Sequence, residues 1–294
     1  MSRCAIVALA GAPNAGKSTL LNRLVGEPLA IVSPKPQTTR APVRGILTED
    51  DTQLVFVDPA GLLEPEYPLH SAMVHAAVEE LRGADLVLYL HPLPEAPAPP
   101  LESLLPPKTS VTAPVITVYT KADTVPPSHR PTVPLSHRPF EHVISALTGE
   151  GIPELLRTIR HLAPEGPWHY PADEVGTQPL RFFAEEYVRE AVFAHLEQEL
   201  PYCTAVTVDE FRESESPVYI RATIAVERES QKPIVLGKGG AMIKRIGTDA
   251  RRRLEALLGG RVRLDLWVKV WPKWRKDPAA LARLGLPLPP EKEQ

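Results

Sequence analysis

The 294-residue sequence predicts two folded domains, a doubly wound and mostly parallel α/β sheet followed by a small α+β domain. Three observations predict this arrangement. Short apolar segments alternate with helical ones through the first half, which is typical of a parallel sheet with crossover helices. The first apolar segment runs into a G-x-x-x-x-G-K-[ST] pattern, and the second half contains a G-x-x-G tetrapeptide between two helical segments.

The composition excludes several classes of protein. With 43% hydrophobic and 23% charged residues, both halves can bury a core, so general disorder is excluded. The two cysteines, Cys4 and Cys203, lie too far apart in the sequence for a disulfide framework and favour a reducing compartment. No charge-free apolar stretch reaches the roughly 20 residues of a membrane helix, and the N-terminal apolar run lacks a cleavage site. We therefore expect a cytoplasmic protein that acts as a monomer.

The first half has the pattern of alternating strands and helices. The continuous apolar run at 4–10 is typical of a strand that is buried on both faces of its sheet. A helix at 17–25 follows, and the later elements are strands at 54–57, 86–90, 115–119 and 142–144 and helices at 71–81 and 152–162. Proline is concentrated in two stretches, with seven prolines at 92–107 and five at 126–139. Because an interior proline costs a helix about 3 kcal/mol, we expect one crossover helix to be absent or much shortened.

The second half has a different order of elements. A helix at 181–200 precedes a β-hairpin, and the later elements are a short segment ending at Leu236, a helix at 241–258 and a strand at 261–270. The hairpin strands are 204–211 and 218–226, so the order is helix–strand–strand–helix–helix–strand. We expect the first domain at 1–163, a linker at 164–176, the second domain at 177–276 and a tail at 277–294.

The glycine-rich segment of the first half lies directly between a strand and a helix, which is the context that its motif requires. Its glycines allow the backbone to wrap around phosphate oxygens, with amides pointing inward at the helix N-terminus. Lys17 is expected to reach the β- and γ-phosphates of a nucleotide, and the Ser18 hydroxyl to bind Mg²⁺. The predicted phosphate-binding residues are Gly11, Ala12, Pro13, Asn14, Ala15, Gly16, Lys17, Ser18 and Thr19.

Three later motifs, each at the end of a predicted strand, favour guanine as the base. The D-x-x-G motif at 58–61 places Asp58 near Mg²⁺ and the Gly61 amide near the γ-phosphate. In the motif Thr120-Lys121-Ala122-Asp123, the aspartate can accept both the ring N–H and the exocyclic amine of guanine, which adenine cannot supply in that arrangement. The backbone amides of Ser145-Ala146-Leu147 can donate to the guanine carbonyl. Ligands of open α/β sheets bind at these strand ends, so we expect GTP and GDP as ligands.

These motifs resemble those of the Era family of GTPases, and the resemblance covers nearly the whole chain. Residues 33–40 resemble the family's first switch region, in which Thr39 would complete the coordination of Mg²⁺ in the GTP state. The resemblance implies a GTPase without the catalytic glutamine of Ras-like proteins, because Leu62 follows Gly61. The implied catalytic residues are Lys17, Thr39, Asp58 and Gly61. Asn14 matches a family asparagine that is associated in related GTPases with an activating K⁺ ion.

Three departures from the family pattern leave the strength of this GTPase open. Thr120 stands where asparagine is usual, Pro59 removes one backbone N–H from the D-x-x-G motif, and proline-rich stretches replace helices beside the base-binding loops. A GTP-driven switch, whose nucleotide state alters the placement of the second domain, is the first interpretation. A constitutive RNA-binding protein with a nearly inactive nucleotide domain is a second, and an ATPase is a third if Asp123 does not select guanine.

The second half carries the features of an RNA-binding domain. Residues 230–276 contain 13 basic and 3 acidic residues, a net charge of +10 in a chain whose overall net charge is −3, and this indicates a polyanion-binding surface. The G-x-x-G loop and the order of elements are those of a type II KH domain, a fold that clamps about four nucleotides of a single strand. Apolar residues before the loop, Val235 included, can offer a floor for bases. The predicted RNA-binding residues are Ile234, Leu236, Gly237, Lys238, Gly239, Gly240, Lys244, Arg245, Arg251 and Arg252.

The resemblance to the Era family is closest at 227–247 and continues at 266–270. It implies binding near the 3′ end of small-subunit ribosomal RNA, a role in assembly of the 30S-type subunit, and peripheral association with the inner face of the cell membrane. Trp267, Trp271 and Trp274 are candidates for stacking on bases, although the apolar alternation around Trp267 favours a core position for at least one of them. The histidines, among them His129 and His137, are expected at the surface rather than in a metal site.

Overall fold

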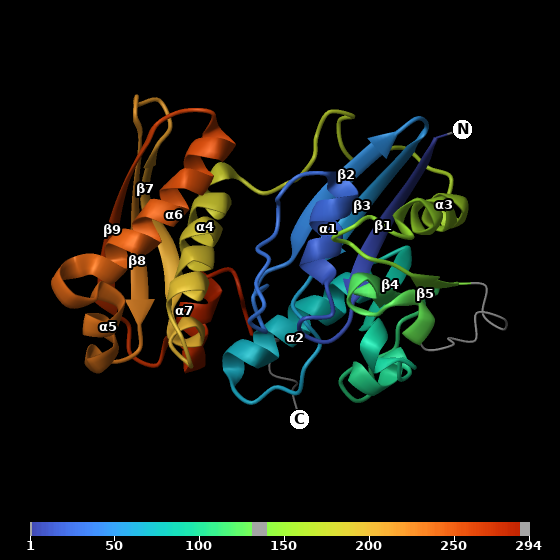
Figure 1. Ribbon diagram of the computed structural model, residues 1–294, viewed down its shortest axis with the longest axis horizontal. Coiled ribbons are helices and arrows are strands. Elements are labelled where there is room, and N and C mark those ends of the chain that lie inside the picture. Colours follow the sequence, from blue (N-terminus) through green and yellow to red (C-terminus); the bar gives the residue numbers. More distant parts are fainter. Residues whose placement is uncertain (1, 131–139, 289–294) are drawn as a thin grey trace. The chain divides into compact units, whose positions relative to one another are not determined.

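The computed structural model describes residues 2–130 and 140–288, and these form two compact units, the second of which spans Gln178–Pro287 (Figure 1). Each unit has its own sheet. Among the described residues, no helix combines the length and the apolar character that crossing a membrane requires.

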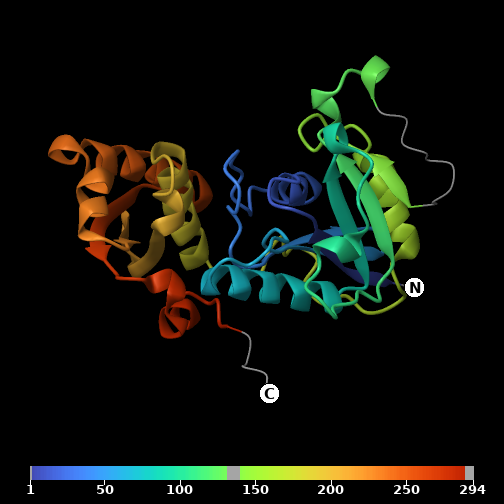
Figure 2. The same ribbon diagram turned by 90° about the horizontal axis from the view of Figure 1, so that it is seen from below.

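The first unit is the doubly wound sheet that the sequence predicts. Its six strands lie in the order β2-β3-β1-β4-β5-β6, and every neighbouring pair is parallel except β2 with β3. Helices α1 and α2 lie on opposite faces of the sheet (Figure 2). The bounds are β1 Arg3–Ala10, α1 Lys17–Val25, β2 Val43–Glu49, β3 Thr52–Asp58, α2 Pro68–Arg82, β4 Leu86–Pro92, β5 Val115–Thr120, β6 Glu141–Val143 and α3 Ile152–Leu162.

The antiparallel edge strand β2 is absent from the elements that the sequence predicts. Gly45 lies in the middle of this strand and weakens its pattern. The glycine is required by packing, because a Cβ at Gly45 would lie 2.6 Å from Cγ2 of Val25 and 2.9 Å from Cδ1 of Leu21. The missing side chain therefore lets α1 pack closely on the sheet and fixes the helix that begins with Lys17.

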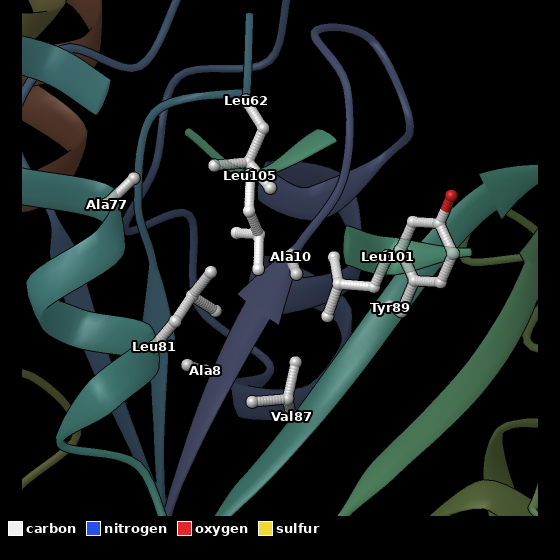
Figure 3. Close-up of a cluster of buried hydrophobic side chains, with 9 residues drawn as sticks. All are labelled: Ala8, Ala10, Leu62, Ala77, Leu81, Val87, Tyr89, Leu101 and Leu105. Carbon is white, nitrogen blue, oxygen red and sulfur yellow. The ribbon is translucent and has the colours of Figure 1, made fainter. Parts of the chain in front are cut away.

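The proline-rich crossover between β4 and β5 contains no α-helix, as expected. Two short 3₁₀ turns, Leu93–Glu95 and Leu101–Leu104, replace it. Leu101 and Leu105 from this segment are buried in an apolar cluster with Leu62 and Leu81 (Figure 3). Two leucines thus cover the sheet where a crossover helix usually does. In the second proline-rich stretch only Pro127–His129 forms a 3₁₀ turn among the described residues, and residues 131–139 lie outside them.

The segment expected as a linker is held against the first unit. The side chain of Gln53, which is fully buried on β3, accepts hydrogen bonds from the N–H groups of His169 and Tyr170 at 2.9 and 3.0 Å. It also donates to the Tyr170 carbonyl oxygen at 2.9 Å. The Ile46 N–H donates to the Val175 carbonyl at 3.0 Å. Residues 164–176 are therefore fastened along the sheet up to the end of the unit.

The second unit has the predicted order of elements and a three-stranded sheet, β7-β8-β9. Strands β7 and β8 are antiparallel, whereas β8 and β9 are parallel. Helices α4 and α6 pack side by side on this sheet (Figure 1). The bounds are α4 Leu180–His195, β7 Ala205–Arg212, β8 Val218–Val226, α5 Lys232–Leu236, α6 Ala241–Leu258 and β9 Val262–Val270.

The segment from 277 onward, expected as a tail, begins with a further helix, α7 Pro278–Arg283. The Asp277 side chain caps this helix by accepting from the Ala279 N–H at 3.0 Å. Ala280, Leu281 and Leu286 are buried. These apolar side chains tie the segment to the second unit, and of the expected tail only residues 289–294 lie outside the described chain.

Candidate functional site

The loop between β1 and α1 holds a buried lysine. At Gly11 the φ angle is +143°, and a Cβ there would lie 2.5 Å from the Leu90 carbonyl oxygen, so only glycine fits this turn. The Lys17 side chain is folded under the loop and donates to the carbonyl oxygens of Gly11 and Ala12 at 3.1 and 3.0 Å. Burial lowers the pKa of Lys17 to about 8, although nearby Asp58 acts in the opposite direction. The loop is therefore shaped around an ammonium group that phosphate oxygens can take over.

Three oxygen ligands from three separate motifs converge beside this lysine. The Ser18 hydroxyl donates to Oδ2 of Asp58 at 2.6 Å and lies 3.0 Å from the Thr39 hydroxyl, which is itself 3.4 Å from the same carboxylate oxygen. Asp58 is fully buried, which raises its pKa to about 6. Its second oxygen, Oδ1, is buried without a hydrogen-bond partner among the described residues. Hydroxyl and carboxylate oxygens are ligands that Mg²⁺ accepts, so this cluster fits Mg²⁺.

The D-x-x-G motif is attached directly to the phosphate loop. A Cβ on Gly61 would lie 2.6 Å from the backbone nitrogen of Pro13, so a larger residue would push the two segments apart. The Leu62 N–H donates to the Gly11 carbonyl at 3.0 Å. The Leu62 side chain is only 3% exposed and points into the apolar cluster of Figure 3, so it cannot orient a water molecule.

The base-recognition motif is anchored by the threonine that replaces the usual asparagine. Thr120 is 2% exposed, and its hydroxyl donates to the Ala15 carbonyl of the phosphate loop at 2.7 Å. The Ser145 hydroxyl donates to Oδ1 of Asp123 at 2.5 Å and so holds that carboxylate. The expectation that the Ser145 amide faces a guanine carbonyl is not met, because this N–H donates to the Glu150 carbonyl at 2.9 Å. The amides of Ala146 and Leu147 are left as the candidates.

These motifs surround one cavity of about 410 Å³. Five other predicted residues do not line the cavity but form hydrogen bonds with residues that do, namely Gly11, Ala12, Ala15, Asp58 and Ser145. The predicted residues that line it are Pro13, Asn14, Gly16, Lys17, Ser18, Thr19, Thr39, Gly61, Thr120, Lys121, Asp123, Ala146 and Leu147.

The cavity also has lining residues that the motifs do not include. Ile31 and Val32 precede the expected switch region, and Val32 is 47% exposed, as is expected of an apolar edge that a bound ring could cover. Gln37 lines the cavity from the switch region itself, and its Oε1 lies 3.0 Å from Nε2 of His70 on α2. His70 is 3% exposed, which corrects the expectation of surface histidines and links the first switch region to α2.

In the described chain no cluster of histidine, cysteine and acidic side chains suits a metal ion. His129 is exposed in the 3₁₀ turn after β5, as expected, and His137 lies outside the described residues.

The G-x-x-G loop of the second unit presents its backbone to solvent. Gly237 has a φ of +73°, and a Cβ there would lie 2.6 Å from the Met242 nitrogen, so it is the glycine that the turn requires. A Cβ added to Gly239 or Gly240 would have no atoms within 4 Å, which leaves open space for a ligand backbone. Ile234 is 52% exposed and Leu236 is half-buried. Val235 is fully buried, so the expected apolar floor has two residues and not three.

The basic residues of the second unit differ in whether acidic partners neutralise them. Arg253 pairs with Glu190 at 2.6 Å, and weaker pairs hold Arg251 and Arg252 to Glu255 and Asp249 at 3.9 and 3.8 Å. Within residues 140–288 the structure shows no ion pair for Lys238, Lys244 or Arg245, none of which is buried. Positive charge without an acidic partner therefore lies at the G-x-x-G end of α6.

The three candidate stacking tryptophans differ in how exposed their side chains are. Trp274 is fully buried, and its indole N–H donates to the Cys203 carbonyl at 2.9 Å, so it belongs to the core. Trp267 on β9 is 58% exposed. Trp271 is half-buried beneath the Arg283 guanidinium, 5.6 Å from the ring centre. The expectation that at least one of the three lies in the core is confirmed by Trp274, while Trp267 stays exposed.

Comparison with known proteins gives the family. Residues 6–121 match the 50S ribosome-binding GTPase family, and residues 199–275 match the KH domain family. The chain is 44% identical over 288 residues to GTPase Era of Thermotoga maritima, which covers 95% of this chain and 96% of that protein. The chain belongs to the Era GTPase family. It is also 42% identical over 302 residues to GTPase Era of Desulfovibrio desulfuricans, covering 97% of each.

Two solved Era structures are similar over nearly the whole length. A variant of Aquifex aeolicus Era bound to GDP and aluminium fluoride has a TM-score of 0.90 and 36% identity, covering 97% of this chain and all of the other. A complex of Era with MgGDPNP and nucleotides 1506–1542 of 16S ribosomal RNA has a TM-score of 0.91 and 36% identity, covering 98% of this chain.

Proposed function

We propose that this Era-family protein is a GTP-binding and GTP-hydrolysing switch. In this proposal it binds single-stranded small-subunit ribosomal RNA near the 3′ end through its KH domain and assists assembly of the 30S-type subunit. The observation that carries the proposal is that three groups meet at one cavity. They are buried Lys17, the oxygen cluster of Ser18, Thr39 and Asp58, and Asp123 with its hydrogen bond from Ser145. The complex of a relative with MgGDPNP and 16S ribosomal RNA supports it.

The nucleotide-binding residues are assigned as the sequence predicts, with roles that follow from their contacts. Lys17 exchanges its two carbonyl partners for β- and γ-phosphate oxygens, and the Gly61 amide of the D-x-x-G motif faces the γ-phosphate. Ser18 and Thr39 would hold Mg²⁺, with buried Asp58 behind them. When bound, this ion neutralises developing charge on the phosphate oxygens. Asp123, held by Ser145, accepts from the guanine ring, and Lys121 lies beside it.

Hydrolysis in this site must proceed without a glutamine, because Leu62 is packed into the core. The Asn14 side chain lies against the first switch region, since its Nδ2 donates to the Pro34 carbonyl oxygen at 3.0 Å. We propose that a K⁺ ion at Asn14 supplies the missing positive charge. GTP turnover at fixed Mg²⁺ is then faster in KCl than in NaCl, and Asn14→Ala removes that difference. Equal rates of the unaltered protein in both salts contradict the role of K⁺.

The RNA-binding residues are assigned to the G-x-x-G end of the KH domain. Lys238, Lys244 and Arg245 neutralise phosphates, and Gly239 and Gly240 admit the nucleotide backbone. Ile234 and Leu236 contact bases, while Arg251 and Arg252 extend the basic face along α6.

Two variants separate the two halves of the proposal. Lys17→Ala abolishes nucleotide binding and leaves RNA binding intact, whereas Lys238→Ala with Gly239→Asp weakens RNA binding and leaves basal GTP hydrolysis unchanged. The measurements are steady-state phosphate release with GTP against ATP, and titration of a fluorescent single-stranded RNA with the sequence of the 3′ end. No GTP turnover with K⁺ and RNA present would leave the alternative, a constitutive RNA-binding protein. The switch is favoured over this alternative because the Thr120 hydroxyl still anchors its loop, through the hydrogen bond to the Ala15 carbonyl oxygen.

Family resemblance is what supports a cytoplasmic location with peripheral association at the inner face of the membrane. The test is co-flotation of the purified protein with vesicles of anionic phospholipid, with neutral phosphatidylcholine vesicles as the control. Protein that stays at the bottom of the gradient with both vesicles contradicts membrane association.

A further inference from the structure

Arg130 joins the two loops at the base end of the nucleotide cavity. Its guanidinium makes a bidentate ion pair with Glu150, with Nη1 to Oε1 at 2.5 Å and Nη2 to Oε2 at 3.0 Å. The same side chain donates from Nη2 to the Ala122 carbonyl at 3.2 Å and from Nε to the Val125 carbonyl at 3.3 Å. Arg130 follows the 3₁₀ turn Pro127–His129, in the stretch where the family resemblance implies a helix. That turn directs the arginine back onto the loop that precedes it.

The contacts form a closed circuit around the base-recognising aspartate. Ala122 and Val125 lie on either side of Asp123, so Arg130 holds the backbone of the first loop on both sides of this carboxylate. Glu150 belongs to the second loop, and its own carbonyl accepts the Ser145 N–H at 2.9 Å. The Ser145 hydroxyl then returns to Asp123 at 2.5 Å. The orientation of Asp123 therefore depends on both loops at once.

We infer that Arg130 and Glu150 are positioning residues that clamp the two base-binding loops together and thereby set the selectivity of Asp123 for the guanine amine. This inference rests on the proposed function, because it requires that the cavity takes a guanine nucleotide. Neither side chain lines the cavity. Both act through the loops and not by touching the base.

Arginine is the side chain that this geometry requires. The planar guanidinium directs donors at a carboxylate and at two carbonyls in one fixed arrangement, which the single ammonium group of lysine cannot reproduce. The guanidinium side chain is 24% exposed, and the hydrogen bonds it gives to Glu150 hold the pKa of that carboxyl below its ordinary value.

The test compares GDP with IDP, whose base lacks the exocyclic amine that Asp123 accepts. Both affinities are measured by competition against a fluorescent GDP analogue on the full chain with Mg²⁺, together with ADP. For Arg130→Ala we expect GDP affinity to fall about tenfold, as when one charge-assisted hydrogen bond is lost. IDP affinity should fall by less, about threefold, since IDP makes only the ring N–H bond to Asp123 and loses one of the two hydrogen bonds that GDP loses. Arg130→Lys should restore only part of the GDP preference.

Two further proteins make the comparison specific. The matched control is Arg157→Ala, which removes an exposed arginine that pairs with Glu154 at 2.9 Å on α3, and it should leave both affinities unchanged. The double variant Arg130→Ala with Glu150→Ala should bind GDP no more weakly than whichever of the two single variants has the lower GDP affinity, because the two side chains act as one unit.

The outcomes separate the clamp from the proposed function. A fall of equal size for GDP and IDP in Arg130→Ala overturns the clamp, because lost charge or general unfolding weakens both alike. If the unaltered protein binds GDP no more tightly than ADP, the proposed function fails. If it discriminates and Arg130→Ala discriminates equally, only the clamp fails.

Discussion

The most direct test of the site's construction is to remove the Thr120 hydroxyl. Thr120→Val keeps the shape of the side chain and removes its one hydrogen bond, which runs to the Ala15 carbonyl at 2.7 Å. Thr120 and Ala15 are 2% and 1% exposed, so water cannot replace the missing donor without opening the site. A buried acceptor left unsatisfied costs about 1–3 kcal/mol. We expect a loss near the middle of this range.

The cost should appear in two measurements on the full chain. The nucleotide-free first unit should lose about 2 kcal/mol of unfolding free energy in urea, which is about 4–8 °C of melting temperature for a domain of this size. GDP affinity should fall by up to about 30-fold, the ratio that 2 kcal/mol corresponds to. The affinity falls because Thr120 contacts the loop beside Gly16, where a Cβ would lie 3.6 Å from the threonine oxygen.

Two control variants show whether the hydroxyl or the methyl group matters. Thr120→Ser keeps the donor and should stay within about threefold of the unaltered protein in GDP affinity. Thr120→Asn, with the family's usual residue, should also retain binding. If Thr120→Val melts and binds GDP like the unaltered protein, the hydroxyl does not anchor the loop. If Thr120→Ser is as weak as Thr120→Val, packing of the methyl group is the cause.

The buried charges, the basic face and the core tryptophan each give a further prediction. The pKa of Asp58 is raised from 3.8 to about 6, so the stability of the nucleotide-free protein should fall as pH rises from 4 to 6. The pKa of Lys17 is lowered from 10.5 to about 8, so stability should rise again from pH 8 to 10.5. Urea unfolding of Lys17→Met should lack this alkaline rise. Lys244→Ala with Arg245→Ala should lower the slope of log RNA affinity against log salt by about 0.7 for each phosphate that is no longer neutralised. Arg253→Ala should leave that slope unchanged, because Glu190 already neutralises this arginine, and an equal decrease would refute the assignment. Trp274→Ala should cost about 3–5 kcal/mol in the free energy of unfolding measured in urea, as for a large core residue.

The motif residues can be predicted from sequence because the strands fix their positions. Gly11, Asp58 and Thr120 each follow or end a short apolar strand, and parallel strands bring such residues to one edge of the sheet. The distance along the chain between the motifs then matters little. The same logic predicts the G-x-x-G loop between two helices and the order of elements around it.

The features that sequence alone does not predict depend on which distant groups meet. Val235 and Trp274 are buried, whereas Trp267 is exposed. Each residue lies in a short element, and the local sequence pattern does not specify which side of that element faces the core. The edge strand β2 is hidden by Gly45, whose reason lies in the packing of α1. Arg130 carries no signal in the sequence, because an arginine in a proline-rich stretch gains meaning only when Glu150 is placed beside it.

The electrostatics of the first unit connect nucleotide binding to the first switch region and to the D-x-x-G motif. Lys17 and Asp58 are both held away from their ordinary pKa values in the direction of their neutral forms, so the protein alone stabilises neither charge fully. A phosphate group offers Lys17 an anionic partner in place of two carbonyls, and this gain is largest where water is excluded. The hydroxyls of Ser18 and Thr39 share the Asp58 carboxylate, so any change in that cluster reaches the first switch through Thr39. It reaches the rest of the D-x-x-G motif through Asp58, three residues before Gly61. We therefore expect a ligand that relieves the buried charges to act on both segments together.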